Sequence, residues 1–302
     1  MAKVVVIGNV TLDVICQPVD EVPRYDSLSF EQVSVSPGGC GSNVAIGLAA
    51  MGASIALVAR TGEDDPAHLL RRTWERMGIE LNYLRSTAAY PTGVSVGLVD
   101  SQQQPRFIHT PGANQTLTAQ DLDPQRYLLD GARSLHIAGY FVLHGLLFPE
   151  FAEKLRQAQQ AGLETSLDVV RTWTMANPQP LWECLPRLDT FFCNAQEAAI
   201  LTGCEQPRRA AEEFHRRGAG RVVIKLGEDG CWLDSPHFQG QIPTQAAPAR
   251  DTTGAGDAFA AGYLAARAQG GDEVEACRSG NATAGKVVQE LGAVTAWIKN
   301  LK

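Results

Sequence analysis

The sequence predicts an α/β fold, in which a doubly wound, mainly parallel central sheet is flanked by helices and carries a small β-sheet lid. Three observations lead to this prediction. Short apolar runs alternate with amphipathic segments along nearly the whole chain. The apolar runs are continuous rather than alternating, which is typical of parallel strands buried on both faces. Two stretches, about 11–36 and 90–111, depart from this rhythm.

The expected strands are short and rich in β-branched and other apolar residues. They are Lys3–Gly8, Ser54–Ala59, Leu135–Ala138, Leu163–Asp168, Thr190–Cys193, Arg221–Leu226 and Gly230–Leu233. Helical periodicity is expected between them at about 42–51, 65–77, 148–158, 195–202, 207–217, 256–269 and 272–290. Such an alternating order of strands and helices predicts a parallel sheet with helices on both faces.

The two remaining stretches are expected to form a lid over the site. Residues 11–36 have no helical period and contain Pro18 and Pro23. In residues 90–111, two apolar runs flank the polar turn Ser101–Gln104, as in a β-hairpin. No internal repeat or linker interrupts the chain, so residues 1–302 are expected to form a single domain with this lid inserted.

Composition excludes several classes of protein. The 302 residues carry a net charge of −7 and no basic run, which argues against binding nucleic acid. The first apolar run is a short strand rather than a signal-peptide core, and no run approaches the roughly 18–20 residues that span a bilayer. We therefore expect a cytoplasmic protein without a membrane partner. The seven cysteines include no C-x-x-C pair, so neither a disulfide framework nor a zinc site is indicated.

The strongest chemical signal is the segment from Asp251 to Phe259, where Gly254, Ala255 and Gly256 open a helix. Tiny residues let a ligand approach the backbone, and the first turn of a helix offers unpaired amides and a positive dipole end. Together they predict an anion site. Asp257 stands in that turn, where a carboxylate is well placed to take a proton from an attacking hydroxyl. The alternative is a well-capped helix with a glycine-rich start.

A second glycine-rich segment contains Gly38, Gly39 and Asn43 ahead of a predicted helix. Asn43 can donate and accept hydrogen bonds at once, which suits a polyol. Asp13 follows the first strand, and ligands of open α/β sheets bind outside the carboxyl ends of the strands. A turn that caps a helix, and an aspartate that forms a turn, are the alternatives.

Two further segments are less specific. Asn194 and Glu197 follow a strand at a spacing that places both on one helical face, where their oxygens suit a hydrated Mg²⁺ or form a capping box. The Lys225–Gly230 segment lines a nucleotide or is a plain hairpin turn. The segment Gly280–Val287 nearly matches the pattern of a phosphate-binding P-loop. It lacks the Ser or Thr of that pattern and lies in a helical stretch, so we reject a P-loop here.

In this order, the motifs resemble those of the ribokinase-like (PfkB) carbohydrate kinase family, from Gly8–Asp13 to Gly292-Ala293. Two of them, residues 38–43 and 251–257, are specific. The resemblance implies that Asp257 is the catalytic base, and that Gly254, Ala255 and Gly256 form the anion hole. It also implies a sugar site of Asp13, Gly38, Gly39 and Asn43 and an ATP site of Asn194, Lys225, Gly227, Gly230 and Asn281. In the same family pattern, Glu197 and Asn194 position Mg²⁺ through water.

Further implications of the resemblance concern ions, the acceptor and partners. Asp251, Thr253 and Gly292 resemble the site for a monovalent cation, with K⁺ as the candidate, and the lid of such kinases often pairs two subunits as a homodimer. Ribokinases carry a substrate-contacting glutamate where this sequence has Gly139-Tyr140-Phe141. Tyr140 takes that position, and an aromatic ring there suits a nucleobase or an apolar sugar face.

These observations predict an ATP- and Mg²⁺-dependent sugar kinase that transfers the γ-phosphoryl group to a hydroxyl, with the sugar left open. A nucleoside kinase of the same fold is the alternative, motivated by Tyr140. A non-catalytic sugar or nucleotide sensor is a third reading, against which all the expected catalytic positions are filled.

Overall fold

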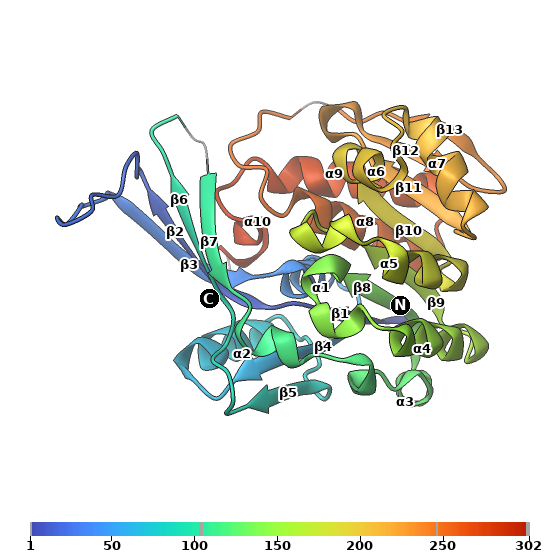
Figure 1. The fold of residues 1–302 in the computed structure, drawn as a ribbon, viewed down its shortest axis with the longest axis horizontal. Helices are drawn as coiled ribbons and strands as arrows, with labels where there is room; N and C mark the ends of the chain where they lie inside the picture. Colours follow the sequence, from blue (N-terminus) through green and yellow to red (C-terminus); the bar gives the residue numbers. More distant parts are fainter. Residues whose placement is uncertain (1, 103–104, 246, 300–302) are drawn as a thin grey trace.

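The central sheet has nine strands in the order β13-β12-β11-β10-β9-β8-β1-β4-β5 (Figure 1). The structure is a computed structural model that describes residues 2–102, 105–245 and 247–299. Strands β11 to β5 of this order run parallel, and β12 is antiparallel to both of its neighbours, β11 and β13. The strands are β1 (Lys3–Gly8), β4 (Ile55–Gly62), β5 (Leu84–Thr87), β8 (Ala132–Ala138), β9 (Glu164–Asp168), β10 (Thr190–Asn194), β11 (Arg221–Lys225), β12 (Cys231–Asp234) and β13 (Gln239–Ile242).

Helices cover both faces of this sheet, which confirms the doubly wound prediction. One core contains Val4 and Val6 of β1, and the other contains Val5 and Ile7, because successive side chains of a strand point to opposite faces. The first core is closed by α1 (Cys40–Ala50), α2 (Asp65–Arg76), α8 (Ala255–Ala268), α9 (Glu273–Val287) and α10 (Thr295–Ile298). The second is closed by α3 (Pro124–Leu129), α4 (Pro149–Gln160), α5 (Gln179–Cys184), α6 (Ala195–Thr202) and α7 (Pro207–Arg216).

The long elements match their predicted positions to within a few residues, and the exceptions have simple causes. Strands β5 and β13 were not predicted. Strand β13 has the sequence Gln-Gly-Gln-Ile and β5 has one buried residue, so neither contains the apolar run that is typical of a buried strand. The prediction of parallel pairing is wrong for β12. The five residues between β11 and β12 are too few for a helical crossover, and the two strands form an antiparallel hairpin.

A separate four-stranded sheet, in the order β3-β2-β6-β7, stands apart from the central sheet (Figure 1). Its strands are β2 (Thr11–Gln17), β3 (Gln32–Gly38), β6 (Val94–Val99) and β7 (Pro105–Thr110). Asn114 fastens its base to the link between β1 and β2, since the side chain accepts from the Val10 amide and donates to the Val10 carbonyl, both at 2.8 Å. Residues 103 and 104 of the expected turn Ser101–Gln104 lie outside the described residues.

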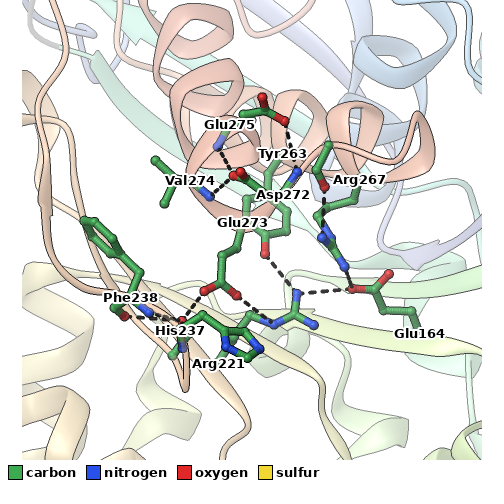
Figure 2. Close-up of polar contacts among 12 residues, drawn as sticks. Glu164, Arg221, His237, Phe238, Tyr263, Arg267, Asp272, Glu273, Val274 and Glu275 are labelled. Carbon is green, nitrogen blue, oxygen red and sulfur yellow. Dashed lines mark hydrogen bonds and ion pairs between the residues drawn. The ribbon is translucent and has the colours of Figure 1, made fainter.

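An ionic network holds α8 and α9 against the amino ends of the strands (Figure 2). Arg221 of β11 donates to Glu164 and to the Tyr263 hydroxyl, both at 3.2 Å, and Arg267 reaches Glu164 at 3.1 Å. Glu273 lies 3.6 Å from the Arg221 Nε. Arg221, Arg267 and Glu273 border a recess of about 740 Å³, and its two arginines are already paired with carboxylates. Because the end of α8 is fixed here, its first turn lies at the opposite, carboxyl edge of the sheet.

The length and the polarity of a helix decide whether it can cross a lipid bilayer. In the part of the chain that the structure describes, no helix combines the length and the apolar character needed to cross a bilayer.

Candidate active site

The expected site residues gather at the carboxyl edge of the sheet, where its strand order changes direction. From β1 the chain proceeds to β4 on one side, and it later continues through β8, β9, β10 and β11 on the other. Ligands of doubly wound sheets bind at such a switch point, outside the carboxyl ends of the strands. The first turns of α1 and α8 both open there, next to the base of the small sheet.

The first turn of α8 presents free backbone amides. Gly254 caps the helix with a φ of 74°, a left-handed conformation that favours glycine, and a Cβ built on it would lie 2.4 Å from the Ala293 Cβ. Ala255 donates to the Thr252 carbonyl. The amides of Gly256 and the next residue have no acceptor within the helix, as in any first turn. The structure thus brings the three small residues of the motif together as a backbone cradle suited to an anion.

Asp257 lies in this turn and contacts α1. Asn43 donates from its Nδ2 to the Asp257 Oδ2 at 2.8 Å. Burial raises the pKa of the Asp257 carboxyl, although Asn43, the Lys225 charge and Cys40 act in the opposite direction. The Asn43 Oδ1 is buried without a protein partner in the described structure. A buried acceptor without a partner costs free energy, so this oxygen suits a hydroxyl donated by a ligand.

The Asp13 side chain, on β2, also lies near Asp257. The Thr11 hydroxyl donates to it at 2.6 Å, and a Cβ built on Gly38 would lie 1.9 Å from its Oδ2. The carboxylate therefore occupies the space that any side chain at position 38 would need. Burial raises the pKa of the Asp13 carboxyl to about 6, the Thr11 hydrogen bond counteracts this, and the negative charge of Asp257 adds to it.

Glycine is also required where α1 begins. Gly39 has a φ of 83°, and a Cβ built on it would lie 2.6 Å from the Asn9 carbonyl oxygen. A Cβ on Gly41 would lie 2.7 Å from the backbone of Gly8. The start of α1 is thus pressed against the end of β1, and this contact carries Asn43 to Asp257.

Asn194 and Glu197 form a capping box at the start of α6. The Glu197 amide donates to Asn194 at 2.8 Å, and the Asn194 amide donates to Glu197 at 2.7 Å. The second oxygen of Glu197 accepts from the Arg171 amide at 3.1 Å. Each carboxylate oxygen keeps a further lone pair, so the two side chains fit a metal ion through its water molecules better than by direct ligation.

The expected nucleotide residues lie on the β11–β12 side. Gly227 and Gly230 flank the short hairpin turn with φ values of 63° and 89°, and a Cβ on Gly230 would lie 2.2 Å from the Ile242 carbonyl oxygen. The Asn281 Nδ2 donates to that same carbonyl at 3.0 Å. Asn281 therefore holds the end of β13 in place with its side chain. The Lys225 Nζ donates to Asp168, the last residue of β9.

The structure contradicts the placement of Tyr140 in the substrate site. Its side chain is fully buried in the second core, with its ring 5.6 Å from that of Phe151. The hydroxyl points to the Leu146 carbonyl at 3.4 Å and to Cys184. The residue after Gly139 turns inward because Gly139 adopts a left-handed φ of 73° and begins a 3₁₀ turn, so counting residues beyond the strand misplaced the side chain.

The residues expected to hold a monovalent cation are also gathered. Asp251 accepts from the Thr253 amide at 2.9 Å and from the Gly292 amide at 2.7 Å. The Asp251 amide in turn donates to the Val288 carbonyl. This carboxylate joins the segment before α8 to the segment after α9, directly beside the anion cradle.

Sequence reasoning did not single out three residues that lie near the expected site residues. Asp168 ends a correctly predicted strand, so its place at the carboxyl edge was available as a signal. Ser95 pairs with Asp13 and His109 pairs with Ser95, so the three residues share one face of the small sheet. The sequence pointed to Ser95 and His109 only through the predicted hairpin. Side chains alternate between the two faces of a strand, so the face on which each residue lies follows once the register of the strands is known.

Three comparisons with known proteins agree. A family model described as pfkB family carbohydrate kinase matches residues 1–300. The ATP-dependent ribose-1-phosphate kinase of Halopiger xanaduensis is 30% identical over 298 residues, which cover 98% of this chain and 95% of that protein. The aminoimidazole riboside kinase of Salmonella typhimurium is 28% identical over 312 residues, covering 98% and 92%.

Solved structures give the same answer. Arabidopsis thaliana ribokinase, complexed with ribose and ATP, has a TM-score of 0.83 at 27% identity, and the match covers 100% of this chain and 99% of that one. The ribokinase of Thermotoga maritima has a TM-score of 0.81 at 27% identity, covering 98% and 96%. The chain therefore belongs to the pfkB family of carbohydrate kinases and is an ATP-dependent phosphotransferase that acts on a hydroxyl of a sugar or nucleoside.

Proposed function

We propose that this protein phosphorylates a free sugar or sugar phosphate whose hydroxyls are held by Asp13 and Asn43, with Asp257 as the catalytic base. The observation that carries the proposal is the contact between Asn43 and Asp257, directly beside the free amides of α8. A hydrogen-bonding amide, a buried carboxylate and an anion cradle meet at one point, which is what hydroxyl-to-phosphate transfer needs.

The reaction is an in-line transfer. Asp257 accepts the proton of the attacking hydroxyl, and its raised pKa makes it a better base than an exposed aspartate. The free amides of the cradle that Gly254, Ala255 and Gly256 form stabilise negative charge on the phosphoryl group as it moves. Positioning and charge stabilisation dominate, because phosphoryl transfer demands little covalent help from the protein.

ATP is proposed to lie along the β10–β12 side, with its phosphates toward α8. The turn at Gly227 and Gly230 and the strand end held by Asn281 would border the nucleotide. A bound Mg²⁺ would neutralise phosphate charge, with Asn194 and Glu197 orienting its water molecules.

Acceptor choice is the finer part of the proposal. The burial of Tyr140 removes the feature that favoured a nucleobase, so a sugar is preferred. A nucleoside stays the second candidate because one relative is an aminoimidazole riboside kinase. A coupled assay of ADP release tests both, with ribose, ribose 1-phosphate, fructose, adenosine, inosine, cytidine and aminoimidazole riboside as acceptors. ADP release with none of them, together with measurable sugar binding, would establish a sensor instead.

Potassium is proposed as an activating ion near Asp251, whose carboxylate lies beside the anion cradle. The same assay, run in potassium and then in sodium at equal ionic strength, measures this. Equal rates in both salts reject a role for potassium.

The acid side of the pH profile follows from Asp13. Its carboxylate must be ionised to accept hydrogen bonds from the acceptor hydroxyls. Its pKa of about 6 means that it gains a proton below that pH. We expect kcat/KM for the acceptor to fall about tenfold per pH unit below pH 6. Initial rates between pH 5 and 8 check this, and a flat profile down to pH 5 contradicts it.

The small sheet is proposed to act as a lid and as a dimer interface. Val35, Val14, Val96 and Ile108 pair in one row across its four strands. Val35 is 54% and Ile108 66% exposed, whereas Asp13 lies on the opposite face of the sheet. A sheet with one solvated face normally carries polar residues on that face. The exposed apolar row therefore fits a second copy of the chain, which would bury the same row.

We expect the double substitution Val35→Glu/Ile108→Glu to convert a dimer into a monomer, because two buried charges in each subunit would be unpaired. Sedimentation velocity measures the mass. Leu129→Glu, at a leucine on α3 that is 80% exposed and lies outside the small sheet, is the control and should leave the dimer intact. A wild-type protein that is monomeric at all concentrations, or a dimer that survives the double substitution, contradicts the interface.

A further inference from the structure

Lys225 and Asp168 form a buried ion pair at the carboxyl edge of the sheet. The Lys225 Nζ donates to both oxygens of Asp168, at 2.6 and 2.8 Å. The side chains are 13% and 5% exposed. Lys225 ends β11 and Asp168 ends β9, so the pair reaches across the end of β10. Since removing two charges from water offsets much of their attraction, stability alone is a weak reason for such a pair.

The ammonium group also faces the first turn of α8. A Cβ built on Gly256 would lie 3.1 Å from the Lys225 Nζ. Because Cα–Cβ bonds in a helix tilt toward its N-terminus, that Cβ position marks the open side of the turn. The Nζ therefore lies next to the space into which the free amides point. The missing side chain of Gly256 leaves the room that the ammonium uses.

The charges around Lys225 keep it protonated. Burial alone would lower the pKa of its ammonium, but the carboxylates of Asp168, Glu197 and Asp257 raise it to about 12. The site thus holds a fixed positive charge beside its backbone amides. Hydrogen bonds between an ammonium and phosphate oxygens are among the strong ones, and they gain strength where water is excluded.

We propose that Lys225 is a further catalytic residue whose ammonium contacts the phosphoryl group during its transfer, and that Asp168 is the positioning residue that holds it there. This inference rests on the proposed kinase function. A bond forms between the acceptor oxygen and the γ-phosphorus, and the bond from that phosphorus to the β–γ bridging oxygen breaks. The acceptor proton goes to Asp257, ADP leaves with the electron pair, and Lys225 keeps its proton while it balances charge on the non-bridging oxygens.

Kinetics separates this role from simple nucleotide binding. A group that contacts the transferring phosphoryl stabilises the transition state, and its loss lowers kcat. A group that only holds ATP contributes equally before and during the reaction, and its loss raises the KM for ATP. We expect Lys225→Met to lower kcat between about ten- and a hundredfold, the worth of a hydrogen bond to a charged group, with little change in the KM for ATP.

The experiment compares Lys225→Met and Lys225→Arg with the control Lys3→Met. Lys3 pairs with Glu80 at 2.8 Å and is 17% exposed, at the amino end of β1, so it matches Lys225 in chemistry but not in place. Steady-state rates use the best acceptor of the panel. Calorimetry measures the affinity for Mg·ADP alone and for Mg·ADP with aluminium fluoride, which mimics the phosphoryl group in flight.

Lys225→Met should weaken binding of the aluminium fluoride complex and leave Mg·ADP binding unchanged, Lys225→Arg should retain part of kcat, and Lys3→Met should behave as the wild type. Asp168→Asn should move the alkaline limb of the kcat profile to lower pH, because a lysine without its carboxylate partner loses its proton more readily. A purely structural pair would not shift that limb.

Unchanged kcat in Lys225→Met, or an equal loss of Mg·ADP and aluminium fluoride binding, overturns the inference. Should Lys225→Met fail to fold by circular dichroism, Lys225→Gln is judged by the same criteria. A wild-type protein that phosphorylates no acceptor refutes the proposed function separately, and the two calorimetric affinities then decide on Lys225.

Discussion

The substitution Asp257→Asn is expected to reduce kcat by roughly 10²–10⁴-fold, the usual loss when a general base is removed. The amide has the shape of the carboxylate, and its oxygen can still accept the hydrogen bond from Asn43. The fold and ATP affinity should therefore persist while proton transfer fails. Initial rates of ADP release measure the loss, and calorimetry with ATP checks that the nucleotide site is intact.

A matched control is Asp234→Asn. Asp234 is 5% exposed and bonds His215 at 3.1 Å, but it ends β12 at the amino edge of the sheet, opposite the first turn of α8. This variant should keep its rate even if it loses stability. Near-normal turnover by Asp257→Asn would remove Asp257 from its proposed role.

Gly38→Ala is expected to lower kcat/KM for the acceptor by roughly 10²-fold, the scale of loss that small displacements of reacting groups produce. The new Cβ would lie 1.9 Å from the Asp13 Oδ2, so the carboxylate must leave its position. The acceptor hydroxyls then lose a charged partner, and the KM for ATP should not change. Titration of acceptor and ATP separately distinguishes the two sites.

Gly285→Ala in α9 serves as the control, since a Cβ there meets its nearest neighbour, Ala247, only at 4.0 Å. It should leave both KM values unchanged. If Gly38→Ala binds its acceptor as well as the wild type does, Asp13 does not hold the acceptor.

The Asp251–Asp257 segment illustrates what could be predicted from local sequence. Small residues before a helix, followed by an acidic residue, predict a cradle of backbone amides with a carboxylate beside it. The reason is that the first turn of any helix has N–H groups without an acceptor in the helix. The capping box of Asn194 and Glu197 was predictable for the same reason. In each case a few consecutive residues define the backbone geometry, so nothing distant has to be known.

Tyr140 shows where local reasoning fails. A side chain one residue beyond a strand can point into the site or into the core, and the left-handed turn at Gly139 decided for the core. The Lys225–Asp168 pair could not be predicted for a different reason. Its two residues lie 57 positions apart in the sequence and meet only because β9, β10 and β11 lie in register.

Sequence by itself determined the alternation of buried strands and amphipathic helices, and with it the doubly wound sheet and the edge at which we propose that the ligands bind. The hydrophobic period and the chemistry of helix starts are local properties, which adjacent residues define without help. Only the tertiary structure decided that Asn43 reaches Asp257, that Asp13 fills the space above Gly38, and that Lys225 faces Gly256. Those contacts depend on strand order and register, which arise when the whole chain packs and which no short segment encodes.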